Sequence, residues 1–369
     1  MEKIDKYQLI SMTILFMIGS TPLYELGIGV KQDAWIVMVA GLLAGLLLLA
    51  LYLYIQRNHA GMDFFQILNT HLGKLVGTVL SVCYVVYFAY ESMRNTREFG
   101  DIINISFLPN TPLSLLMLVM VLLSGYAISK GVEVFFRVAE FMFPFTIFGY
   151  AALFCLIIGS NIIHLDRLLP VMEHGLVPIL EQAIPEVISF PFGQIVVFLM
   201  FWSHLNEKRK MVRVSVYSYL FVGVLLLLFN VLNLAILDPS ITSITTFPLL
   251  RSVRLIQIAN FLERLDPVII LLIYIGIFVK MTAFYLGAVL GLAHLVRISR
   301  FKLTVFVGAA IYGMSFLAPN FIYHVWIGFA QNLKYHFPVF QICIPALLAA
   351  IIFCKSWNDK KKKRAKQPS

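Results

Sequence analysis

Long apolar segments recur along the whole chain, separated by short polar stretches. About twenty apolar residues are needed for a helix to cross the hydrocarbon core of a bilayer. The pattern therefore predicts about ten transmembrane helices, at residues 7–30, 34–55, 73–98, 112–128, 138–159, 178–204, 211–237, 266–294, 302–319 and 336–355.

Composition supports this prediction, because 60% of the 369 residues are hydrophobic and only 13% are charged. A soluble domain carries about 25% charged residues. We therefore expect an all-α polytopic membrane protein, with residues 1–369 forming a single integral membrane domain that ends in a basic tail, 356–369. The cysteines lie in apolar segments without paired spacing and are interpreted as small hydrophobic residues, not metal ligands: Cys83, Cys155, Cys343 and Cys354.

The net charge of +10 is distributed unevenly along the chain. Lys and Arg gather in the predicted loops on the side of the N-terminus and in the run 360–364, so the positive-inside rule predicts that both termini are cytoplasmic. The sequence has no basic patch interleaved with aromatic residues, so we expect these charges to face anionic lipid and not nucleic acid.

Two predicted helices are interrupted by proline and glycine. Gly19-Ser20-Thr21-Pro22 breaks the first, and Ser189-Phe190-Pro191-Phe192-Gly193 breaks the sixth. Backbone without hydrogen bonds is tolerated at membrane depth only where it is buried in protein or lines a cavity. Paired breaks in corresponding parts of two halves are typical of a small-molecule site in secondary transporters, although kinks of this kind can also be purely structural.

Lys280 lies at the same depth as the two breaks. It is about 21 Å from each end of its predicted helix, and Gly19 is about 18 Å from the start of the first. A charge at mid-bilayer usually faces an interior. One interpretation is that its ammonium replaces a bound cation and contacts the carbonyls of Ile18 and Gly19. The other is an ion pair with a carboxylate that the sequence does not identify.

The chemistry of the breaks favours an α-amino acid as ligand. A half-helix that starts near Pro22 would offer N–H groups to a carboxylate, and the hydroxyls of Ser20 and Thr21 would assist. The carbonyls before Pro191 lack an N–H partner and would accept from an amine. Tyr84 and Tyr87, three residues apart in the third predicted helix, could line the site or could serve only in packing.

Three segments resemble the spore germination permeases. They are the Ser189–Gly193 break with its apolar tail Ile195–Phe201, the pair Lys130–Glu133 and Arg137–Glu140, and the first helix broken at Gly19-Ser20. Proteins similar to this chain often carry Glu directly after Pro-Phe-Gly, whereas this chain has Gln194. This chain therefore has no carboxylate at that position to take part in ligand or proton handling.

The resemblance implies two inverted five-helix repeats, at about 7–159 and 178–355, with helices 1 and 6 broken at the ligand site. It implies a germinant-sensing subunit in the spore inner membrane that binds a small molecule, with an amino acid as the expected germinant, and acts with an A subunit and a lipoprotein C subunit. The alternative is a symporter that translocates its amino acid or cation. The sequence has no signature of an enzyme or of a cofactor site.

Overall fold

The protein is described by a computed structural model that covers residues 2–173, 175–256 and 266–365. Within these residues the chain is helical and forms no strand. Six helical segments are long and apolar enough to cross a membrane, and Leu113–Ser129 is a shorter apolar helix. The six are Ile28–Asn58, Lys74–Ser106, Val132–Gly159, Lys208–Leu237, Pro267–Leu295 and Phe321–Asn358. The other predicted crossings fall on broken or shorter helices.

The α-helices follow the predicted segments closely. They are α1 (Lys6–Ile18), α2 (Ala34–Asn58), α3 (Phe64–Leu72), α4 (Lys74–Ser106), α5 (Leu113–Ser129), α6 (Val132–Gly159), α7 (Leu176–Gln182), α8 (Met211–Leu237), α9 (Pro239–Ile244), α10 (Pro248–Arg254), α11 (Asp266–Leu295), α12 (Arg300–Met314), α13 (Phe321–Trp326) and α14 (Ile344–Ala365). The sequence did not anticipate α3, which begins at an Asp63 capping box.

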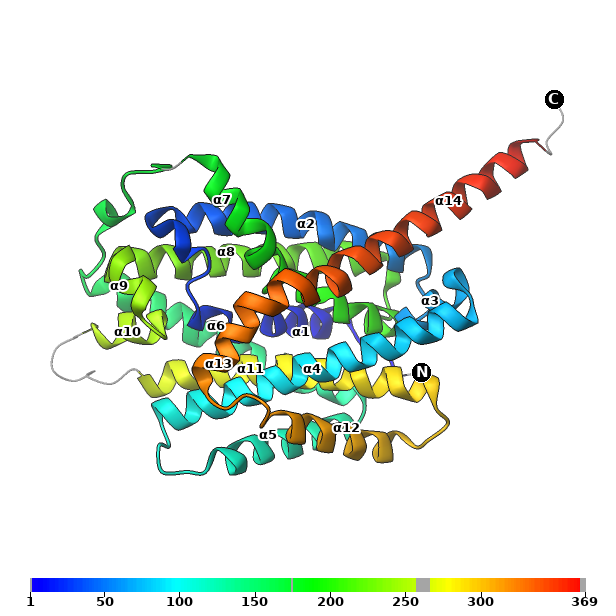
Figure 1. The fold of residues 1–369 in the computed structure, drawn as a ribbon, viewed down its shortest axis with the longest axis horizontal. Coiled ribbons are helices and arrows are strands. Elements are labelled where there is room, and N and C mark those ends of the chain that lie inside the picture. The colour runs from blue at the N-terminus through cyan, green and yellow to red at the C-terminus, as the bar shows by residue number, and fades with distance from the viewer. Residues whose placement is uncertain (1, 174, 257–265, 366–369) are drawn as a thin grey trace.

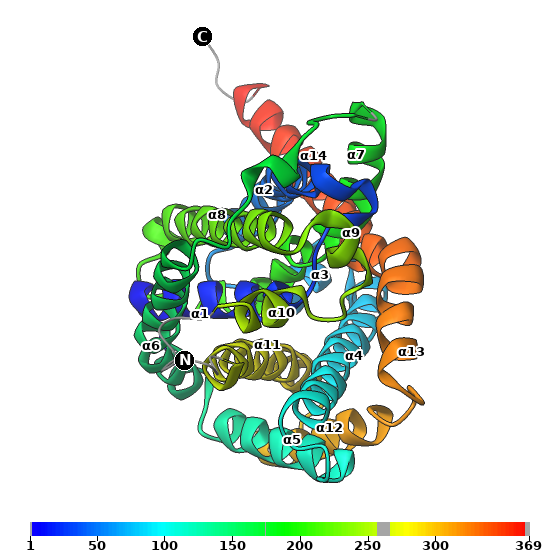
Figure 2. The ribbon, with the colours of Figure 1, turned by 90° about the vertical axis from the view of Figure 1, so that its left-hand side faces the viewer.

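The long helices run side by side, and α14 extends beyond the others toward the C-terminus (Figure 1). Viewed along the bundle, α1 lies between α8 and α11 and beside α6, and it packs against all three (Figure 2). The pair α4 and α11 forms the most extensive helix–helix contact. Helices from the two halves of the chain are thus interleaved, and the first helix is enclosed by the others.

The first break is sharper than the sequence predicts. α1 ends at Ile18, Gly19 adopts φ +42°, and only a 3₁₀ turn, Thr21–Leu23, follows. The prediction of a half-helix beginning near Pro22 is wrong. The chain leaves the turn in extended conformation at Tyr24 and bends again at Gly27, whose φ of +80° favours glycine.

The second break connects three kinds of helix. α7 continues into a π-helix, Ala183–Val187, and after Pro191 the chain forms a 3₁₀ helix, Phe192–Met200. Runs of 3₁₀ helix longer than three or four residues are uncommon and often mark a functional hinge. The break predicted at Pro191 is therefore present, and its second half is a nine-residue 3₁₀ helix.

The last helix begins earlier than predicted. The sequence suggested a start near residue 336, but the helix starts at Phe321, where the side chain of Asn320 accepts a hydrogen bond from the N–H of Tyr323 at 2.8 Å. It then passes through two π-helical segments, Ile327–His336 and Pro338–Cys343, before α14. Its polar residues lower the apparent hydropathy of this segment, which explains the wrong boundary. Residues 366–369 of the predicted basic tail lie outside the described residues.

Candidate functional site: a central cavity with a charged wall

A cavity lies between α4, the segment that follows the first break, the second break and the last helix. The empty volume of the cavity, counted together with the solvent at its open mouth, is about 480 Å³. The residues that line it are Tyr24, Glu91, Arg94, Asn95, Glu98, Phe190, Gln194, Val325, Gly328, Phe329, Leu333 and Phe337. Segments far apart in the sequence therefore meet at one place.

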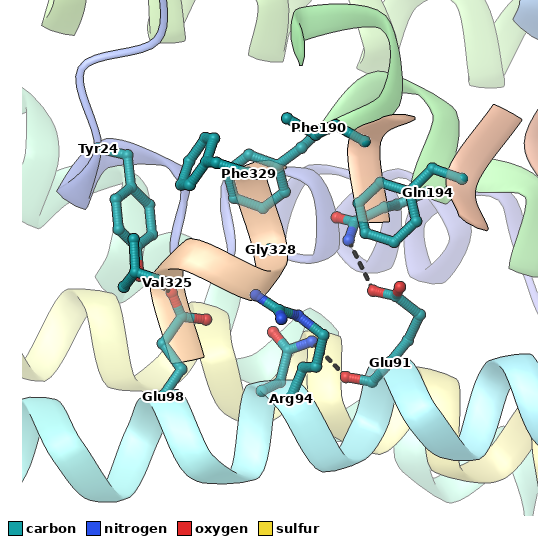
Figure 3. A pocket seen from close by; sticks show the side chains of 12 residues that line it. Tyr24, Glu91, Arg94, Glu98, Phe190, Gln194, Val325, Gly328 and Phe329 are labelled. Atoms are coloured by element: carbon teal, nitrogen blue, oxygen red, sulfur yellow. Dashed lines mark hydrogen bonds between the residues drawn. The ribbon is translucent and has the colours of Figure 1, made fainter. Parts of the chain in front are cut away.

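One face of α4 supplies the charges of the cavity. Glu91, Arg94 and Glu98 are three and four residues apart, so they project from the same side of the helix (Figure 3). Gln194 donates to Glu91 Oε2 at 2.9 Å, and the hydroxyl of Tyr24 donates to a Glu98 oxygen at 2.6 Å. The segments that follow the two breaks therefore each hold one carboxylate of α4 in place.

Glu91 and Arg94 retain hydrogen-bonding capacity. Glu91 Oε1 is buried and has no partner among the described residues. Arg94 donates through Nη1 to the carbonyl oxygen of His324 at 3.3 Å, and its remaining N–H groups stay close to the cavity. A side chain at Gly328 would overlap the guanidinium of Arg94, so this glycine makes room for it. An unpaired acceptor and a guanidinium thus face the same space.

The rest of the cavity wall is apolar and largely aromatic. The ring of Tyr24 makes edge contacts with Phe190 and Phe329, with centroids 6.1 and 5.7 Å apart. Leu333 and Phe337 continue this surface along the π-helical part of the last helix. π-helical segments occur frequently at functional sites. The cavity therefore combines one charged wall with one apolar wall.

Lys280 of α11 lies behind the cavity and contacts both breaks. Its side chain is fully buried, its Nζ lies 4.4 Å from the ring centroid of Phe190, and a Cβ added to Gly19 would lie 2.6 Å from its Cδ. Nζ has no hydrogen-bond partner among the described residues. The carboxylates whose charges act on it are Glu98 and Glu91. Among the described residues, Lys280 forms neither interaction suggested by the sequence: it makes no hydrogen bond to the carbonyls of the first break and no close ion pair.

The first break packs against α11 and does not line the cavity. A Cβ at Gly276 would lie 2.6 Å from the carbonyl oxygen of Gly19, so the two backbones are in close contact. Thr21 donates to the carbonyl oxygen of Met17 at 3.2 Å, and Ser20 Oγ is buried without a partner among the described residues. Pro22 is buried on the side of α8.

The second break contributes Phe190 to the cavity, and its other residues pack behind it. Ser189 and Pro191 are not among the lining residues, and a side chain at Gly193 would overlap Gln341. The tyrosines predicted as a wall lie deeper. Tyr84 donates to the carbonyl oxygen of Phe340 at 2.7 Å, and Tyr87 accepts from Gln341 at 2.9 Å.

The charged residues of α4 were missed by the sequence analysis. Glu91, Arg94 and Glu98 lie toward the end of the predicted third helix, residues 73–98, and were not among the predicted site residues. Their spacing on one helical face was a signal that could have identified them. α4 continues to Ser106, so these residues lie well inside the helix.

The apolar helices and the enclosed cavity define a helical integral membrane protein whose fold also occurs in transporters. Two solved structures share the fold. The structure of MhsT in complex with L-phenylalanine superposes with a TM-score of 0.64 and covers 94% of this chain and 87% of that chain, at 11% identity. Mhp1, a nucleobase-cation-symport-1 family transporter with bromovinylhydantoin bound, gives a TM-score of 0.60 at 12% identity, covering 95% and 76%.

The chain belongs to the spore germination permease family, since the family model described as "Spore germination protein" matches residues 3–321. It is 30% identical to spore germination protein KB of Bacillus subtilis (strain 168), over 99% of this chain and 97% of that protein. It is 24% identical to spore germination protein A2 of the same organism, over 88% and 87%.

Proposed function

We propose that the chain is the germinant-sensing membrane subunit of a spore germinant receptor, and that the central cavity binds an amino acid. The observation that carries this proposal is the pair Glu91 and Arg94. They are three residues apart on α4, face one cavity, and retain an acceptor oxygen and donor N–H groups. An α-amino acid presents an ammonium and a carboxylate at similar separation, so the pair complements it.

The apolar wall indicates the kind of side chain that the ligand carries. Phe190, Phe329, Leu333 and Phe337 surround the space opposite the charged wall. A cationic or anionic ligand side chain would be desolvated there without a partner, at a cost of several kcal/mol. We therefore expect amino acids with apolar side chains to be the effective germinants.

The family and its relatives support a role in germination, and the wider assembly follows from this role. We propose that the chain resides in the spore inner membrane with both termini in the cytoplasm, as its Lys and Arg distribution indicates. We further propose that it acts with the A subunit and the C subunit of a germinant receptor. Binding in the cavity would then shift the equilibrium between two conformations of the complex.

The test uses spores that carry this chain as their only copy. Wild-type spores should germinate with an apolar amino acid, and spores carrying Arg94→Gln should not respond at any accessible concentration. Membrane vesicles with the wild-type chain should not accumulate the labelled amino acid. Accumulation that depends on an ion gradient would instead support the symporter, whose fold this chain shares.

A further inference from the structure

An apolar groove lies between α5 and α12, on the opposite side of the bundle from α2 (Figure 2). It shares no lining residue with the central cavity, and its empty volume, counted together with the open space at its mouth, is about 990 Å³. Ser129 near the end of α5 and Phe301 near the start of α12 line the same end, so the two helices run antiparallel. From Leu118 to Ser129 the groove follows α5 for about 16 Å, close to one leaflet of a bilayer whose core is about 30 Å thick.

Two glycines give this groove its depth. Tyr285 of α11 forms the floor, and a Cβ added to Gly308 would lie only 2.2 Å from the hydroxyl oxygen of this tyrosine. On the facing helix, a Cβ added to Gly125 would lie 3.6 Å from the same oxygen, which is an ordinary contact. Space therefore remains in front of Gly125, between walls of aliphatic side chains such as Val121 and Val305.

The hydroxyl groups along the groove are satisfied by the protein itself. Tyr285 donates to the carbonyl oxygen of Thr304, and Ser129 donates to that of Tyr126 at 2.7 Å. Thr304 in turn donates to the carbonyl oxygen of Arg300 at 3.0 Å. A polar ligand would lose its water here without gaining hydrogen bonds from these groups. The surface is therefore complementary to a hydrocarbon chain.

A positive charge lies at the Ser129 end of the groove. Lys130 ends α5, is exposed, and places its Nζ 5.1 Å from the ring centroid of Tyr126, which lines the groove. The carboxylate at this corner is already engaged, because Glu2 accepts from Arg300 at 2.9 Å and from the N–H of Val132. Lys130 forms no ion pair within the described part of the chain.

The start of α12 adds backbone donors at the same end. Ser299 precedes the first residue of this 15-residue helix, and its side chain makes no capping hydrogen bond. The first N–H groups of a helix have no partner inside the helix, and together with the helix dipole they favour an anion. Phe301 of this first turn lines the groove. The hydrocarbon-like groove thus opens at a site suited to a phosphate.

We propose that the groove binds one acyl chain of an anionic phospholipid, with its phosphate between Lys130 and the first turn of α12. A phosphodiester supplies the missing counter-charge and the hydrocarbon chain in a single molecule. Basic residues between transmembrane helices on the cytoplasmic side recognise anionic headgroups, and the distribution of Lys and Arg predicts that side for this end. The site does not depend on the proposed function, because the lipid binds without a germinant.

The test is native mass spectrometry of the purified protein in detergent. Phosphatidylglycerol and phosphatidylcholine with identical acyl chains are added in equal amounts. The wild-type protein should retain about one phosphatidylglycerol per chain in preference to phosphatidylcholine. Phosphatidylglycerol should also raise the melting temperature more than phosphatidylcholine does, because a ligand that binds only the folded protein stabilises it.

Two variants separate the groove from the charge at its mouth. Gly125→Leu should abolish lipid retention, because its side chain fills the space in front of Tyr285; Gly159→Leu is the control, since Gly159 in α6 has nothing within 4 Å of an added Cβ. Lys130→Gln should weaken phosphatidylglycerol about fivefold and leave phosphatidylcholine unchanged, the effect expected of one Lys beside an anionic headgroup. Arg57→Gln is its control, because Arg57 is exposed at the end of the distant α2.

Equal retention of the two lipids by the wild-type protein, with equal melting temperatures, would overturn the proposal even if Gly125→Leu fails to fold. Undiminished retention of phosphatidylglycerol in a folded Gly125→Leu would overturn it as well, by placing the lipid elsewhere. A partner subunit that co-purifies with the wild-type chain, leaves no lipid bound and is lost in Gly125→Leu would show that a protein helix occupies the groove instead.

Discussion

The two helix breaks hold corresponding places in the two halves of the chain, yet their surroundings differ. At the first, Gly19 is packed against Lys280 and Gly276 of α11, with no space between the backbones. At the second, Phe190 and Gln194 face the central cavity. The first break is therefore tightly packed, and the second is part of the cavity wall. A proline and a glycine inside an apolar helix indicate where the backbone is interrupted, but not which interruption faces the cavity.

Gly19→Val is expected to have the largest effect at the first break. Gly19 has a φ of +42°, which is strained for any other residue and costs about 1–3 kcal/mol. The added Cβ would also collide with Lys280. We expect spores with this variant to lose the germination response and the purified protein to melt at a lower temperature. Gly73→Val is the control, because Gly73 has φ +81° but nothing within 4 Å of the added Cβ. An unchanged dose–response curve for Gly19→Val would show that the packing at this break is unimportant.

Lys280→Met tests whether the charge behind both breaks is needed. Burying an ammonium without a partner is costly, so its removal should leave the abundance of the protein in membranes unchanged or raised. We expect the germination response to be lost, because Lys280 contacts Gly19 and Phe190 at once. Quantitative immunoblots of spore membranes, with the exposed Lys302→Met as control, accompany the germination assay. Joint loss of abundance and response would identify Lys280 as a structural residue.

Phe190→Leu tests whether the second break lines the binding cavity. The smaller side chain enlarges the space beside the apolar wall. A change of one or two methylenes in such a pocket changes the free energy of binding by about 1–3 kcal/mol. The ratio of effective concentrations for leucine and alanine should therefore change by about tenfold or more. Ser189→Ala is the control, since Ser189 is buried in the same break but does not line the cavity. An equal shift for both amino acids would argue against a lining role for Phe190.

The smallest expected effect lies away from both breaks, at the end of α3. His71 Nε2 is 2.8 Å from His59 Nε2, and Lys355 of α14 donates to the carbonyl oxygen of His71 at 3.1 Å. Burial, His59 and Lys355 lower the pKa of His71. The unfolded chain therefore binds a proton more readily, so this contribution to stability is full above the ordinary histidine pKa of about 6.5 and falls as the pH drops below it.

Hydrogen exchange measures this effect locally. Amides of α3 should exchange faster at pH 5.5 than at pH 7.5, after correction for the intrinsic rates, whereas amides of α5 should not change. In His71→Gln the pH dependence of α3 should disappear. Faster exchange of α3 in the wild-type protein at pH 7.5 than at pH 5.5 would contradict the sign of the shift.

Much of the fold was predictable because lipid imposes simple rules on sequence. Apolar length located most of the helices, and the proline and glycine motifs located both breaks. The last helix was misplaced, because polar residues between Phe321 and His336 lower the hydropathy of its first half. The ten-helix inverted repeat stays a prediction.

The site was harder to predict than the fold. Lys280 and both breaks meet in space as their common depth indicated, but the charged face of α4 was overlooked. Glu91 and Arg94 have the i, i+3 spacing of a surface ion pair, and only the enclosure by the last helix makes them the wall of a cavity. This enclosure depends on how the helices pack together, and the spacing of residues along one helix carries no information about that packing.

The central claim is that Glu91 and Arg94 bind the two charged groups of an amino acid. The most direct test measures the affinity of the purified protein, by isothermal titration calorimetry, for leucine and for isoamylamine, which lacks the carboxylate. Wild type should bind leucine at least about tenfold more tightly, since a charge-assisted hydrogen bond is worth about 1.5–3 kcal/mol. In Arg94→Gln the two affinities should become equal. Undiminished preference for leucine in Arg94→Gln, or no binding of any apolar amino acid to the wild-type protein, would contradict the account.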